Sequence, residues 1–146
     1  MGDEATIDWC EANYAVTKYV AEFWNTISNA SFVVFACLGL YSAYKYKFER
    51  RFVLQYISVA VIGIGSALYH ATLRYVEQQC DETPMVWGGL VWIYLMYSSD
   101  WNAFRKQYEQ SGQTHAALLY KSFPILMATY GIGFAILHAH YRFTTF

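Results

Sequence analysis

A serine and a histidine lie four residues apart, Ser66 and His70, in a segment without charged side chains. In an α-helix this spacing places both side chains on one face. A neutral imidazole can bind zinc, and a serine hydroxyl can donate a hydrogen bond to a developing oxyanion. Gly63 and Gly65 would let a neighbouring helix approach closely. The pair predicts either a catalytic face or an interhelical serine hydrogen bond beside a histidine satisfied near a membrane interface, and the spacing favours neither.

Oxygen-bearing side chains are concentrated near the N-terminus, where Asp8, Glu11, Asn13 and Glu22 occur within 15 residues. Hard cations such as Ca²⁺ take several carboxylate, amide and backbone oxygens as ligands. The spacing is not that of an EF-hand loop. Alternatively, Asp8 and Glu11 form a capping box that opens a short interfacial helix, and Glu22 is the polar edge of the next helix. Both interpretations remain open.

A third cluster is acidic and precedes a proline: Asp81-Glu82-Thr83-Pro84. Such a run is typical of a helix N-cap, with acidic residues favoured by the helix dipole and Pro84 in the first turn. A carboxylate at the depth of His70 could also act as a general base or orient a metal ligand. The two roles can coexist.

Segments that lack charged residues predict the helices that must position these side chains. Charged residues make up only 14% of the 146 residues, and apolar residues 56%. A helix of roughly 20 apolar residues spans the hydrocarbon core of a bilayer. We therefore expect an all-α transmembrane bundle, one domain over residues 1–146, with helices at about 22–44, 52–74, 83–104 and 117–138. A soluble helical bundle is the alternative.

Charge also bears on orientation and partners. The net charge is −1, which predicts no nucleic-acid partner. Seven basic residues lie in the expected connections 45–51 and 105–121, against three on the other side. By the positive-inside rule the N-terminus lies in a lumen or outside the cell.

The clusters occur in four blocks that together resemble the alkaline ceramidase family. The resemblance covers nearly the whole chain and is most specific in the first two blocks. These are Thr6-Ile7-Asp8-Trp9-Cys10-Glu11-x-Asn13-Tyr14 and Ala21-Glu22-Phe23-Trp24-Asn25-Thr26-x-Ser28-Asn29, followed by Gly65-Ser66-x-x-x-His70-x-Thr72-Leu73-x-Tyr75 and Asp81-Glu82-x-Pro84-Met85.

The resemblance implies a seven-helix membrane hydrolase, similar in plan to the adiponectin-receptor relatives, that cleaves ceramide to a sphingoid base and a fatty acid. It implies residence in the endoplasmic reticulum or Golgi, with ceramide and membrane lipid as partners. It further implies a zinc ligand, His70, an oxyanion donor, Ser66, and a residue that handles the protons of the attacking water, Asp81. Calcium ligands are implied at Asp8, the Trp9 carbonyl, Glu11, Asn13 and Glu22.

The chain departs from the family in one respect. Two further zinc ligands of the family lie in an H-x-x-x-H pair on a seventh helix, and that pattern does not occur here. We therefore expect the N-terminal part of a ceramidase, inactive as residues 1–146 alone. The chain has three cysteines, and the resemblance implies that Cys10 pairs with a cysteine outside it. The alternatives are a lipid-binding or receptor-like protein without catalysis and a truncated isoform that acts as a structural partner.

Overall fold

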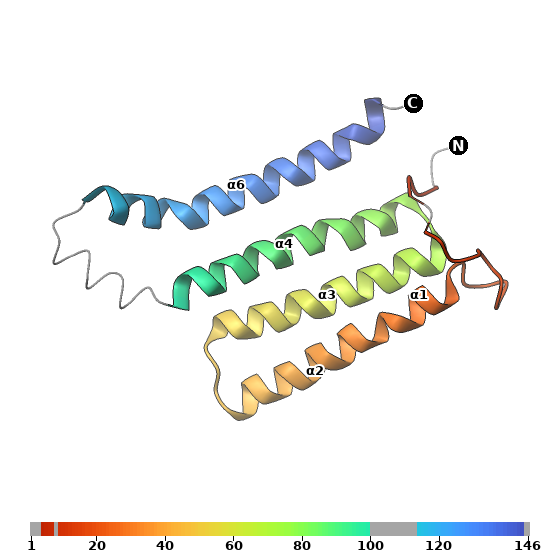
Figure 1. The fold of residues 1–146 in the computed structure, drawn as a ribbon, viewed down its shortest axis with the longest axis horizontal. Helices are drawn as coiled ribbons and strands as arrows, with labels where there is room; N and C mark the ends of the chain where they lie inside the picture. Colours follow the sequence, from red (N-terminus) through yellow and green to blue (C-terminus); the bar gives the residue numbers. More distant parts are fainter. Residues whose placement is uncertain (1–3, 8, 100–113, 145–146) are drawn as a thin grey trace. The chain divides into compact units, whose positions relative to one another are not determined.

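The computed structural model describes residues 4–7, 9–99 and 114–144. It confirms the all-α class, since the described residues form helices and only isolated β-bridges, between Glu4 and Arg74 and between Thr17 and Val20. Figure 1 shows the helices in chain order. They are α1 (Phe23–Ser28), α2 (Ala30–Lys45), α3 (Arg50–Thr72), α4 (Tyr75–Ser99) and α6 (Thr114–Thr144).

The chain divides into two compact units, residues 1–88 and 89–146. The first unit contains all three clusters singled out above. In it, α1 and α2 follow one another through Asn29 and run alongside α3, and a two-residue turn leads from α3 into α4 (Figure 1). The short turn makes α3 and α4 antiparallel neighbours, so residues near the end of α3 face residues near the start of α4.

Three helical segments are long and apolar enough to cross a membrane in the part of the chain that the structure describes: Phe23–Lys45, Arg50–Thr72 and Ser122–His140. They agree with the first, second and fourth expected spans. Large apolar side chains on α2 lie exposed, for example Phe35 at 69%, as a lipid-facing helix surface requires. The expected span at 83–104 lies partly in α4, and its last five residues fall outside the described ranges.

The expected start of that helix is wrong, because α4 begins at Tyr75 rather than near residue 83. Leu73 ends α3 in the left-handed conformation with φ 50°, and its N–H donates to the Tyr69 carbonyl. The chain therefore reverses within two residues and enters α4 at once. Asp81 accordingly lies inside the helix and does not cap it. Pro84 lies in the third turn instead of the first.

Pro84 and Gly65 bring the backbones of α3 and α4 together. Because proline has no N–H, the carbonyl of Cys80, four residues earlier, lacks its regular helical donor. A Cβ atom on Gly65 would lie 2.1 Å from that carbonyl oxygen, so only glycine fits here. The next residues of the two helices are Ser66 and Asp81. This backbone contact therefore sets the two side chains opposite each other.

Candidate functional site

The site is built on a buried carboxylate, Glu22, at the N-cap of α1. Its exposed fraction is 0%, and its carboxylate forms an ion pair and hydrogen bond with Nδ1 of His70 on α3. The backbone N–H of Trp9 donates to Oε1 at 3.2 Å, and the Asn25 amide donates to Oε2 at 3.1 Å. Three donors thus compensate a charge that would otherwise be costly to bury. The Glu22 backbone N–H also donates to the His70 carbonyl, at 2.9 Å, which joins the two residues through both main chain and side chain.

This pairing determines the chemistry of the imidazole. An ionised carboxylate accepts the hydrogen of Nδ1, so the free electron pair of neutral His70 is on Nε2. A carboxylate on the far ring nitrogen is the usual support of a metal-binding histidine. The His70 side chain is 12% exposed, and the rings of Tyr69 and Trp9 lie beside it with centroids at 5.0 and 6.3 Å. The environment fits a zinc ligand that offers Nε2.

Ser66 and Asp81 face each other across the α3–α4 contact. Their exposed fractions are 9% and 7%, and the Ser66 side chain is close enough to Asp81 to influence the pKa of its carboxyl. Asp81 lies outside the three candidate membrane spans. Burial raises the pKa of its carboxyl, while Ser66 and the nearby His70 act in the opposite direction. Among the residues that the structure describes, Oδ1 of Asp81 is buried without a hydrogen-bond partner. The structure therefore brings the three predicted catalytic and zinc-ligating residues into one place, with an acceptor left open on Asp81.

Glu11 is a helix cap in this structure. Its two carboxylate oxygens accept the backbone N–H groups of Trp24 and Asn25, each at 2.8 Å, in the first turn of α1. A negative charge at this end of a helix is stabilising. The alternative of a capping box that opens a helix at Asp8 is wrong, because residues 9–22 form turns and a bridge, and the first helix begins at Phe23.

The expected calcium ligands lie partly together. The Glu11 and Glu22 carboxylates both accept hydrogen bonds from Asn25 at the start of α1. A carboxylate offers about four acceptor positions; Glu11 uses two here and Glu22 three, so both retain capacity for a cation. Asp8 lies outside the described residues. Among those described, no three histidine, cysteine or acidic side chains are grouped closely enough to hold a metal. The calcium set stays a prediction.

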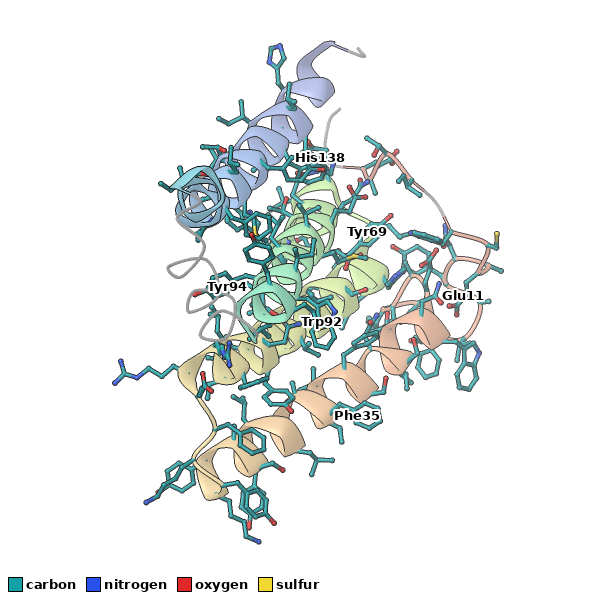
Figure 2. The ribbon with its side chains drawn as sticks, turned by 60° about the vertical axis from the view of Figure 1, so that its left-hand side comes forward. Glu11, Phe35, Tyr69, Trp92, Tyr94 and His138 are labelled. Carbon is teal, nitrogen blue, oxygen red and sulfur yellow. The ribbon has the colours of Figure 1, made fainter. Side chains whose placement is uncertain are left out.

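Two residues that sequence reasoning missed also belong to this end of the unit. Gln78 is 1% exposed and Tyr69 1% exposed, and both bind the N-terminal segment, which we define as residues 4–7 together with Trp9. Figure 2 shows Tyr69 and Glu11 at this same end, with Phe35 farther away, on the first half of α2. The adjacent Gln78 and Gln79, in a helix start that is otherwise mainly acidic and apolar, were the available signal.

The cysteines provide no test of the expected pairing. Cys10, Cys37 and Cys80 are exposed free thiols. The disulfide expected for Cys10 would need a partner beyond this chain, so it stays a prediction.

The fold and site define a helical membrane protein in which a carboxylate-supported histidine faces a serine and an aspartate. The chain matches the model of the ceramidase family over residues 2–146, and it belongs to this family. It is 45% identical over 140 residues to an alkaline ceramidase of Arabidopsis thaliana, which covers 95% of this chain and 48% of the relative. It is 40% identical over 93 residues to alkaline ceramidase 3 of Mus musculus, covering 64% of this chain and 35% of the relative.

A yeast relative, alkaline ceramidase YPC1 of Saccharomyces cerevisiae, is 48% identical over 84 residues, which is 58% of this chain and 27% of the relative. The chain thus spans about half the length of the Arabidopsis relative and less of the other two. The membership of the family expected from the four blocks is confirmed.

Proposed function

We propose that the protein to which this chain contributes hydrolyses the amide bond of ceramide, giving a sphingoid base and a free fatty acid. The observation that carries the proposal is the buried Glu22–His70 pair beside Ser66 and Asp81. The relatives named alkaline ceramidases support the substrate. The apolar helices support a substrate that stays in the bilayer, since two hydrocarbon tails can lie between or beside them.

We propose zinc as the catalytic metal, with Nε2 of His70 as one ligand. When bound, zinc lowers the pKa of a coordinated water toward about 7 and polarises the amide carbonyl. The remaining ligands are expected from the H-x-x-x-H pair that the family resemblance implies, because a catalytic zinc site generally uses three protein ligands. Glu22 holds the imidazole in the required tautomer.

Asp81 and Ser66 have separate roles in the proposed reaction, proton transfer and stabilisation of the oxyanion. Asp81 accepts the proton of the attacking water at its unpaired Oδ1 and passes it to the leaving amine nitrogen. A carboxyl whose pKa is raised by burial is a stronger base than an exposed one, which suits this task. Ser66 donates a hydrogen bond to the oxyanion that develops on the carbonyl oxygen. The contact between Gly65 and Cys80 keeps the two side chains within reach of the same substrate group.

We propose a structural calcium at Asp8, the Trp9 carbonyl, Glu11, Asn13 and Glu22. The open acceptor positions on Glu11 and Glu22 support it. A cation here would join the N-terminal residues to the start of α1, and through Glu22 it would stabilise the histidine. We also place the N-terminus and the site on the lumenal side of the endoplasmic reticulum or Golgi membrane.

A chimera tests the proposed hydrolysis directly. This chain would replace the matching N-terminal part of the Arabidopsis alkaline ceramidase, which it matches over 140 residues, and release of fatty acid from a labelled ceramide would be measured. We expect activity that needs zinc. His70→Ala should remove it, and Ser66→Ala should lower kcat by about 10²–10³-fold.

Gln55→Leu is the matched control, since Gln55 lies on α3 and its side-chain oxygen is buried without a partner. It should leave activity near that of the parent chimera. A chimera that melts cooperatively like the Arabidopsis protein and yet does not hydrolyse ceramide would refute the proposal. So would a His70→Ala chimera that keeps full activity.

A further inference from the structure

Gln78 forms a buried hydrogen-bond network at the start of α4 that lies outside the proposed catalytic residues. Its Oε1 accepts the backbone N–H of Thr6 at 2.8 Å and lies 3.1 Å from the Thr6 hydroxyl. Its Nε2 donates to that hydroxyl at 2.9 Å and to Oε1 of Glu82 at 2.8 Å. A neutral amide is the side chain that can accept and donate here at once.

Other contacts attach the same stretch of chain at neighbouring points. The Ala5 N–H donates to the Leu73 carbonyl at 3.0 Å, and the Tyr69 hydroxyl donates to the Ile7 carbonyl at 2.6 Å. These bonds join the N-terminal segment to the end of α3 and to the turn before α4. Together with Gln78 they form a clasp, by which we mean the bonds made to Ala5, Thr6 and Ile7.

The clasp is only a few residues from the site. Trp9 donates its backbone N–H to Glu22, and its ring lies beside that of His70 with the two planes inclined by 60°. Three residues of extended chain reach at most about 11 Å, so Trp9 cannot keep its place if Thr6 leaves α4 by a large distance. If Trp9 moved away, the buried Glu22 carboxylate would lose one of its three hydrogen-bond donors. The carboxylate would then hold the His70 imidazole less firmly.

We propose that Gln78 is a positioning residue that, through Thr6, holds Trp9 on the Glu22–His70 pair. It touches neither substrate nor metal. The inference deepens the proposed function, since that pair is the proposed support of the zinc ligand. The clasp can be measured without zinc or ceramide, so failure of this inference is distinguishable from failure of the proposed hydrolysis.

The test uses the metal-free full chain, residues 1–146, in lipid nanodiscs, with Gln78→Leu compared with the parent. Amide exchange at Thr6 and Trp9 would be measured by mass spectrometry. The ring Nδ1–H signal of His70 would be followed by NMR in protein labelled with ¹⁵N-histidine, assigned by its loss in His70→Gln. Loss of the bonds to Thr6 should speed exchange at Thr6 and Trp9 roughly tenfold or more. The His70 signal should shift or broaden.

Gln55→Leu makes the same change of side chain where no hydrogen bond is lost, and it should alter neither measurement. Faster exchange at Thr6 with unchanged Trp9 exchange and an unchanged His70 signal would overturn the inference, because the clasp would then be structural only. Unchanged exchange at both residues would overturn it as well. If Gln78→Leu does not fold, Thr6→Val, at an exposed position, removes the hydroxyl bonds, and the same criteria apply to Trp9 and His70.

Discussion

Replacing Gly65 by alanine tests how closely α3 and α4 must approach to form the site. The added Cβ would lie 2.1 Å from the Cys80 carbonyl oxygen, 2.8 Å from the carbonyl carbon and 3.3 Å from the Asp81 nitrogen. A Cβ atom is essentially never closer than 3.0 Å to such an atom, so the two backbones must separate by at least 3.0 − 2.1 = 0.9 Å. No side chain can rotate to relieve the contact, because all three atoms belong to the backbone.

The energy follows from two opposing effects. Alanine favours a helix over glycine by about 1 kcal/mol. Overpacking at a close contact costs about 1–3 kcal/mol, and a contact between backbones belongs near the upper end of that range. We expect Gly65→Ala to lower the free energy of unfolding by about 1–2 kcal/mol. A misplacement of about 1 Å between groups that act on one substrate can lower the rate by about 10²-fold, so kcat in the chimera should fall by that order.

Gly89→Ala, on the neighbouring helix α4, is the matched control, because a Cβ at that position meets no atom of the described residues within 4 Å. It should raise the free energy of unfolding by up to about 1 kcal/mol and leave kcat unchanged. Unfolding would be followed by circular dichroism during titration with a denaturing detergent. If Gly65→Ala proves as stable and as active as Gly89→Ala, the close approach of the helices does not set the site, and the reasoning is refuted.

Three further predictions concern topology, calcium and the extent of the chain. A glycosylation acceptor fused before Met1 should be modified and one inserted in the loop 45–51 should not be, since the basic residues place that loop in the cytosol; the reverse pattern would contradict the orientation. In the chimera, Glu22→Ala should lower the free energy of unfolding by about 3 kcal/mol, because it leaves His70 and Trp9 without their acceptor. Added Ca²⁺ should raise the melting temperature of the parent far more than that of the variant, and equal responses would argue against the calcium site. Purified residues 1–146 with added zinc should release no more fatty acid from ceramide than their His70→Ala variant, because a single histidine with Ser66 and Asp81 does not complete a zinc site; a higher release would contradict this account.

Composition and periodicity are enough to establish the class of fold and the residues worth examining. An apolar helix of about 20 residues without charged side chains is more stable in the hydrocarbon core of a bilayer than in water, and it has the length needed to cross that core. The spans can therefore be predicted from composition alone. The helical period by itself places Ser66 and His70 on one face. Family membership follows from ordered blocks of residues.

How these elements meet depends on the tertiary structure. The charges from Arg74 to Glu82 predict a connection before the third span. The left-handed Leu73 instead turns the chain sooner, so that α4 begins at Tyr75 and Glu77 lies in its first turn. Glu22 and His70 are 48 residues apart, and Thr6 and Gln78 are 72 apart. Such pairs depend on the angle of a turn and on where a glycine lets two backbones touch. Local periodicity reports which face a side chain is on, and it contains no information about which distant face lies opposite.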